Sequence, residues 1–274
     1  MRGHRLDRRW IHAAAATVAL AWCAAPAGAA RAAGPAPPFL SLERYTPDEG
    51  LSQHAITALA EDDRGLLWIG TQEGLNRFDG HRFTVLRSSP GDSSALASSS
   101  IESLAVDRRS RLWVGTNDAG LEVIDLRTRR HTRLGTAQGL GHPTVTAMLL
   151  DPDGGAWLGT AGGVDRVDAA LSAVTRAGRT APVVAMARAA DPAAPSPATG
   201  YALDARCGVW RLSLPTVTSV VAALPGRPTC IGLSVDGDTL WLGTASHGLF
   251  EVGIDGDVRR HVDATALRDV AGTQ

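Results

Sequence analysis

Short apolar runs alternate with charged or glycine-rich turns between residues 56 and 262, and one arrangement of runs and turns recurs along the chain. Each unit has an apolar run, a polar turn, a run centred on tryptophan, a turn ending in glycine, and two further runs. Short β runs bounded by turn residues are typical of antiparallel meanders. The pattern predicts five units of four strands, near 56–88, 101–135, 145–177, 183–221 and 230–262.

The tryptophan run sets the period. Trp68 and Trp113 are 45 residues apart, and Trp113 and Trp157 are 44 apart. Self-similarity at this spacing is the mark of propeller blades or solenoid units, none of which buries its own apolar face. We expect an all-β propeller of four-stranded antiparallel blades, with tryptophans packed between blades and glycines that let backbones approach. These structural positions are Trp68, Trp113, Trp157, Trp241, Gly70, Gly115, Gly159 and Gly243.

The fourth unit is degenerate. Tyr201 stands where the other units have tryptophan, and an alanine- and proline-rich segment, 189–199, separates it from the first strand of the unit. Such a segment is most simply a surface loop. The count therefore stays at five repeats.

Residues 1–33 have a different composition from the rest. Four arginines precede an alanine-rich apolar run over 11–25, and small residues follow at 27–32. This is the layout of a secretory signal peptide, with an uncleaved anchor as the alternative. We expect the mature chain to be periplasmic or secreted, with no membrane span after the signal peptide.

Charge and motifs argue against several classes of function. The net charge is -1 and no basic stripe is present, so we expect no nucleic-acid partner. No nucleophile motif, phosphate-binding glycine loop or paired-histidine motif appears, so we expect no enzyme, no cofactor and no metal. The acidic stretches 151–154 and 236–238 fall where other units have turns, and turns explain them better than calcium sites do.

Candidate binding residues lie in the loops that share one edge of a propeller. These are the turns between second and third strands and the loops between successive units, and loops on a rigid scaffold are where binding sites tend to lie. The candidate ligand-binding residues are Gln53, His54, Gln72, Glu73, Asn117, Asp118, His142, Ser246 and His247.

Two cysteines remain after the signal peptide, Cys207 and Cys230. Their positions map to the same edge of neighbouring blades, so a disulfide is conceivable in an oxidising compartment. The alternative is two small core residues.

The residues from Trp68 to Gly80, Trp-x-Gly-Thr-x-x-Gly-Leu followed by Phe-Asp-Gly, resemble the two-component regulator propeller repeat. So does the opening phrase from Arg44 to Gln53. The resemblance implies a periplasmic sensor region of a bacterial hybrid histidine kinase or diguanylate cyclase. In that family two seven-bladed propellers are usual, followed by an immunoglobulin-like domain, a membrane span and an output domain.

Residues 39–46 match a fourth strand that arrives before any unit of its own. We expect a lone outer strand there, and the tail 263–274 as the start of a further blade. The chain is then an incomplete, apparently truncated, seven-bladed ring. The alternative is a closed five-bladed ring in which the lone strand is added to one blade.

These observations predict a ligand-sensing propeller of a two-component or cyclic-di-GMP receptor that binds rather than catalyses. Kinase or cyclase activity would need domains absent from this chain. The expected ligand is a small molecule such as an oligosaccharide or peptide, and the expected partners are a second copy or a signalling kinase or cyclase. The alternatives are a cell-envelope propeller hydrolase or lyase and a protein-binding scaffold.

Overall fold

The computed structural model describes residues 43–178, 181–188, 200–213, 216–221 and 224–264, and the chain divides into two compact units, 1–45 and 46–274. The predicted signal peptide 1–33, the insertion 189–199 and nearly all of the tail 263–274 lie outside the described residues. In the first unit Tyr45 donates a hydrogen bond to the Glu43 carboxylate at 2.7 Å.

The predicted outer strand over 39–46 is wrong where it is described, because residues 43–46 form no strand. A strand requires a hydrogen-bonded neighbour, and every sheet among the described residues has four strands, all from within residues 56–262. The fifth blade already has a fourth strand of its own.

Five four-stranded antiparallel sheets make up the second unit, which confirms the predicted all-β propeller architecture. Blade 1 has strands β1(Ile56–Glu61), β2(Leu67–Thr71), β3(Gly74–Phe78) and β4(Phe83–Leu86); blade 2 has β5(Ile101–Val106), β6(Arg111–Thr116), β7(Leu121–Asp125) and β8(His131–Leu134). Blade 3 has β9(Val145–Leu150), β10(Ala156–Thr160), β11(Gly163–Val167) and β12(Val174–Gly178). Blade 4 has β13(Val183–Arg188), β14(Gly200–Asp204), β15(Val209–Ser213) and β16(Thr216–Val221). Blade 5 has β17(Cys230–Asp236), β18(Thr239–Thr244), β19(Leu249–Gly253) and β20(Val258–Val262).

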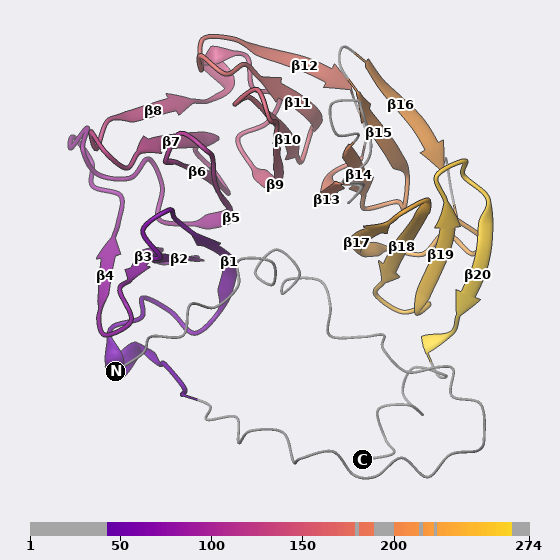
Figure 1. The fold of residues 1–274 in the computed structure, drawn as a ribbon, viewed down its shortest axis with the longest axis horizontal. Helices are drawn as coiled ribbons and strands as arrows, with labels where there is room; N and C mark the ends of the chain where they lie inside the picture. Colours follow the sequence, from indigo (N-terminus) through magenta and orange to yellow (C-terminus); the bar gives the residue numbers. More distant parts are fainter. Residues whose placement is uncertain (1–42, 179–180, 189–199, 214–215, 222–223, 265–274) are drawn as a thin grey trace, which may run out of the picture. The chain divides into compact units, whose positions relative to one another are not determined.

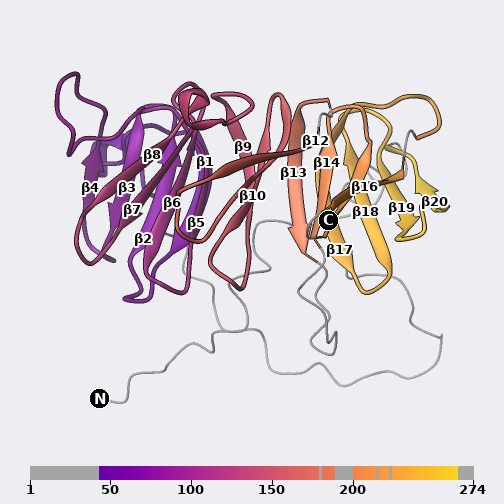
Figure 2. The same ribbon diagram turned by 90° about the horizontal axis from the view of Figure 1, so that it is seen from above.

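The blades follow one another in an arc, with the first strand of each blade on the concave side and the fourth on the convex side (Figure 1). First strands contact in the order β1, β5, β9, β13 and β17, so each blade packs on the next. The view turned by 90° shows blade following blade in sequence order (Figure 2). Blades 1 and 5 lie at the two ends of the arc.

At three of the four interfaces between blades, an aliphatic side chain of a first strand lies on a glycine of the preceding blade. A methyl group placed on Gly70 would lie 2.7 Å from Ile101 Cγ2, and one on Gly159 would lie 2.5 Å from Val183 Cγ1. Val145 takes the same position over Gly115. A Cβ atom at Gly70, Gly115 or Gly159 would occupy the space of the neighbouring aliphatic side chain. Close packing between blades therefore explains these three glycines.

The tryptophans lie in the same interfaces. Trp113 is fully buried in a cluster with Val145, Ala156 and Leu158 of blade 3. Trp68 packs in the same way against blade 2, and Trp157 against blade 4. The side chain after each tryptophan faces the other neighbour, so both faces of an internal blade are apolar.

The two end blades leave such faces uncovered. Ile56 and Leu59 of blade 1 are 50% and 58% exposed, whereas Ile101, the counterpart of Ile56 in blade 2, is 0% exposed. In blade 5 Ile231 is 62% exposed and Trp241 is only half-buried. A closed five-bladed ring would bury these residues, so the structure does not support that alternative.

Candidate functional site

In four of the five blades, a threonine at the end of the second strand closes the turn that follows it. Thr71 Oγ1 donates to the Gly74 carbonyl at 3.0 Å and accepts from the Glu73 N–H at 3.1 Å. The hydroxyls of Thr116, Thr160 and Thr244 make the same pair of bonds in their own turns. We call this edge the rim: it holds the second-to-third-strand turns and the loops that lead into each first strand.

A buried polar side chain in the third strand holds the loop that enters each of the first three blades. Asn76 Oδ1 accepts from the Ser52 N–H at 2.8 Å, Glu122 Oε2 from the Ala97 N–H at 2.9 Å, and Asp165 Oδ2 from the Gly141 N–H at 2.9 Å. All three side chains are 0% exposed. These bonds fix the rim loops to the blades, so the rim is preorganised.

Sequence reasoning missed these three residues. Each directly follows the apolar residue that begins its third-strand run. The first three units therefore all have a polar residue at this one register. That coincidence was the available signal. Units 4 and 5 have Trp210 and Phe250 at the same register, which hides it in a five-unit comparison.

The electrostatic surroundings of the anchors differ. Glu122 is paired with Arg133 Nε at 3.0 Å and with His131 Nδ1 at 2.9 Å, so its charge is compensated. Burial of Asp165 raises the pKa of its carboxyl, against smaller opposing effects of the Gly141 N–H and the Arg176 charge. Asn76 holds its loop without a charge, and its side-chain amide also donates a hydrogen bond to the Ile69 carbonyl at 3.1 Å.

The nine predicted rim residues fall into three groups. On blade 1, Gln53 Oε1 accepts from the Gln72 N–H at 3.2 Å, and His54, Gln72 and Glu73 are exposed. On blade 5, Ser246 Oγ and His247 Nδ1 lie within hydrogen-bond distance, 3.0 Å apart.

The third group spans blades 2 and 3. Thr144 connects it, because its hydroxyl donates to the Asn117 carbonyl at 2.5 Å and its N–H donates to His142 Nδ1 at 3.1 Å. Asn117 and Asp118 are exposed. Over the described ranges no hydrogen bond joins one group to another, so the rim is a spread surface rather than a convergent pocket.

A cavity of about 440 Å³ lies beside the loop between β4 and β5, at the outer part of the rim. None of the nine predicted residues lines it. Its lining is rich in hydroxyls and holds one carboxylate and one guanidinium: Ser88, Ser89, Pro90, Gly91, Asp92, Ser93, Leu96, Ala97 and Arg133. Hydrogen bonds from the Ser94 hydroxyl and N–H lower the pKa of Asp92, so this carboxyl stays ionised. The cavity therefore offers donors and acceptors to a polar ligand.

The acidic turns lie at the edge opposite the rim and have structural partners. Asp151 and Asp153 pair with Arg166 at 2.8 and 3.2 Å, and Asp238 pairs with Arg259 at 2.9 Å. In the part of the chain that the structure describes, no three histidine, cysteine or acidic side chains gather in a way that would hold a metal ion.

Two further aspartates at that edge fix the tryptophans. The Trp68 indole N–H donates to Asp62 at 3.1 Å, and the Trp113 indole N–H donates to Asp107 at 3.0 Å. Each bond satisfies the one polar atom of a buried indole.

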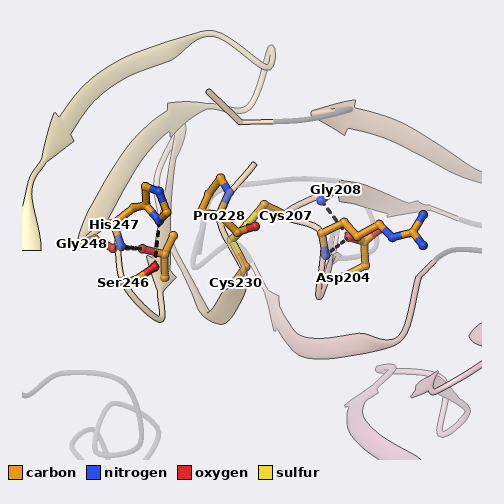
Figure 3. Close-up of a disulfide and its surroundings, with 10 residues drawn as sticks. Asp204, Cys207, Gly208, Pro228, Cys230, Ser246, His247 and Gly248 are labelled. Atoms are coloured by element: carbon orange, nitrogen blue, oxygen red, sulfur yellow. Dashed lines mark hydrogen bonds between the residues drawn. A yellow bond between two sulfur atoms is a disulfide. The ribbon is translucent and has the colours of Figure 1, made fainter. Parts of the chain in front are cut away.

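Cys207 and Cys230 form a disulfide with a Cα–Cα distance of 5.1 Å, and both are buried (Figure 3). It joins the second-to-third-strand turn of blade 4 to the start of blade 5, on the rim. Cys230 occupies the register of Ile101 and Val183, while Leu203 occupies the register of Gly159. The bridge thus connects the one internal pair of blades that lacks the interface glycine.

The described residues include no helix long and apolar enough to cross a membrane.

Comparison with known proteins finds a match to one family model in three segments of the chain. The model of the two component regulator propeller matches residues 50–73, 95–118 and 139–162. Over 56 residues, the chain is 43% identical to histidine kinase P4 of Formosa agariphila. This aligned segment covers 20% of this chain and 4% of that protein.

Solved structures show the same fold. The extracellular domain of the putative hybrid two component system BT3049 from B. thetaiotaomicron is 20% identical with a TM-score of 0.55, over 81% of this chain and 36% of that one. The extracellular domain of the putative one component system BT4673 from the same organism is 17% identical with a TM-score of 0.63, over 78% and 30%. The chain therefore spans about a third of these domains.

Proposed function

Because this chain is built on two-component regulator propeller repeats, we propose that it is a periplasmic ligand-sensing module of a bacterial signalling receptor. The observation that carries the proposal is the rim: its turns are closed by threonine hydroxyls and its loops are anchored by buried polar side chains, while its tips stay exposed. A preorganised scaffold with polar tips is suited to binding.

The ligand we propose is a small polar molecule, an oligosaccharide or a short peptide. The serine-rich cavity beside the β4–β5 loop supports this class, because its hydroxyls, the Asp92 carboxylate and the Arg133 guanidinium offer both donors and acceptors. The Arg133 charge is held in place by Glu122, so a ligand meets it without reorganisation.

Signalling requires that ligand binding shifts an equilibrium between two arrangements, by an amount equal to its differential affinity for them. We propose that the two arrangements differ in how blades or copies pack. The output, a kinase or a cyclase, belongs to a partner or to another part of a receptor. In this proposal the chain itself binds and does not catalyse.

Thermal-shift screening of the purified chain with oligosaccharide and peptide libraries tests the proposal. A ligand that binds only the folded state raises stability by about 2.7 kcal/mol at 100 times its Kd. Gln72→Ala and Asn117→Ala, both at exposed tips, are expected to weaken binding at the inner rim, and Ser89→Ala to weaken it at the cavity.

Arg64→Ala and Arg108→Ala are matched controls, because both side chains are exposed at the opposite edge. They are expected to leave the shift unchanged. The proposal fails when neither library yields a shift, or when the controls abolish binding as completely as the rim variants do.

A further inference from the structure

The two ends of the arc present the two halves of one interface. At three of the four interfaces inside the arc, the first strand of a blade places an aliphatic side chain over the glycine of the preceding blade, as Ile101 does over Gly70. Among the described residues, blade 1 has the aliphatic residue, Ile56, without a glycine beneath it, and blade 5 has the glycine, Gly243, without a side chain over it.

The uncovered half on blade 1 is a complete copy of a buried face. Ile56 and Leu59 occupy the registers of Ile101 and Leu104, as the strand pairings show. Ile101 is 0% exposed, but Ile56 and Leu59 are 50% and 58% exposed. Leu67 of β2 continues this face at the register of Leu112, which is also 0% exposed in blade 2. Ile69, at the register of Val114, is already buried at 5% exposure, and polar Glu61 and Asn76 share this face, so its exposed apolar part is formed by Ile56 and Leu59.

The uncovered half on blade 5 is formed as well. A Cβ atom on Gly243 would meet only the backbone of Gly232, at 3.8 and 4.0 Å, whereas one on Gly70 or Gly159 would collide with the next blade. Ile231 is 62% exposed at the register of Val184, which packs against blade 5 from blade 4. The glycine seat is open, and apolar surface flanks it.

We propose that a second copy of this chain fills each face, head to tail. Ile56 of one copy lies over Gly243 of another, and Leu59 packs against the half-buried Trp241. The occupant is a copy of this chain because the chain already makes this contact between its own blades, with the same residue types at the same registers. The interface is continuous with the established blade stack, since it adds blade 1 of one copy directly after blade 5 of another.

This contact is heterologous, because it uses two different surfaces of the chain. Head-to-tail contacts close into rings when the rotation permits and otherwise extend. The purified chain is therefore expected to associate in a concentration-dependent way, and blocking either face alone is expected to stop it.

Two single-face variants test the geometry. Ile56→Asp places a charge on the first face, and Gly243→Val fills the glycine seat; the first residue is exposed and the second has open space beside it, so both variants are expected to fold. Each variant alone should be a monomer by light scattering. Mixed in equal amounts, they should form a 1:1 dimer with twice the monomer mass, because each retains the face that the other has lost.

Leu59→Asp serves as a second first-face variant, and circular dichroism verifies folding in each case. Wild-type chain that stays monomeric at high concentration overturns the proposal and assigns the faces to another occupant. So does continued self-association of both variants, or a mixture that shows no dimer. None of these outcomes depends on whether a ligand binds the rim, so this proposal and the proposed function fail separately.

Discussion

Blade 2 and blade 1 have nearly the same residue types at corresponding positions but very different exposure. Ile101 of blade 2 is fully buried against Gly70, while Ile56 of blade 1 is half exposed. The difference lies only in whether a preceding blade is present. In this fold the apolar core lies between blades. The contribution of a side chain to folding stability therefore depends on the neighbouring blade and not on its own blade.

The largest expected difference between the two blades is in the effect of truncating Ile101 or Ile56 to alanine. Ile101→Ala removes buried methyl groups and is expected to lower the free energy of unfolding by about 2–5 kcal/mol. Ile56→Ala, at low protein concentration, is expected to change it by less than about 0.5 kcal/mol. Urea denaturation measures both, and equal losses would contradict the idea that the neighbour supplies the core.

The disulfide sharpens the comparison at the interface between blades 4 and 5. There Leu203 replaces the glycine and Cys230 replaces the aliphatic residue, so we expect the bridge to supply part of the missing stability. Replacing Cys207 and Cys230 together by alanine removes a crosslink over 23 residues and is expected to cost about 3 kcal/mol. Thermal unfolding with and without reductant checks this.

In that experiment, reductant should lower the melting temperature of the wild-type chain and leave the double variant unaffected. A free thiol on Cys207 or Cys230 in the denatured, non-reduced wild-type protein, located by alkylation and peptide mapping, would contradict the bridge.

The glycines provide the next contrast. Gly70→Ala places a methyl group 2.7 Å from Ile101 and is expected to destabilise the chain by about 1–3 kcal/mol through overpacking. Gly243→Ala meets open space and is expected to be neutral, or to stabilise by about 0.5 kcal/mol by restricting the unfolded chain. The two melting temperatures should move apart; a parallel shift would mean that both glycines serve only the backbone.

The smallest effect concerns the anchors of blades 1 and 3. Burial raises the pKa of Asp165, so the folded chain holds a proton there more tightly than the unfolded chain does. The contribution of this group to stability therefore falls as pH rises from the unfolded-state pKa of about 3.9 through the folded-state pKa. Asp165→Asn removes this loss and offers a hydrogen bond to the Leu158 carbonyl, as Asn76 does to Ile69.

We expect Asp165→Asn to stabilise the chain by about 1 kcal/mol near neutral pH. The gain should shrink as the pH approaches 4, as urea unfolding at the two pH values would show. Asn76→Asp is the reverse control and should lose stability at neutral pH. A gain that does not change with pH would exclude the carboxyl as its source.

The repeat made the blades predictable, because the tryptophan strands, 44 or 45 residues apart in the first three units, and the turns beside them are local signals. The anchors Asn76, Glu122 and Asp165 were not predicted, since their shared register shows only in the first three units and a single polar residue in a strand does not show which loop it binds. Residues 43–46 of the strand expected over 39–46 form no strand, because pairing depends on a partner that the segment itself does not specify. The cavity beside Arg133 was missed because it arises from the path of one long loop.

The threonine hydroxyl that closes this turn in four of the five blades has a consequence for how the turn tips can vary. Since Thr71 and its three counterparts satisfy the turn backbone from within the strand, residues at the turn tips carry little of the folding energy. Tips can then be exchanged among lineages, and new chemical preferences acquired, while the scaffold beneath them persists unaltered.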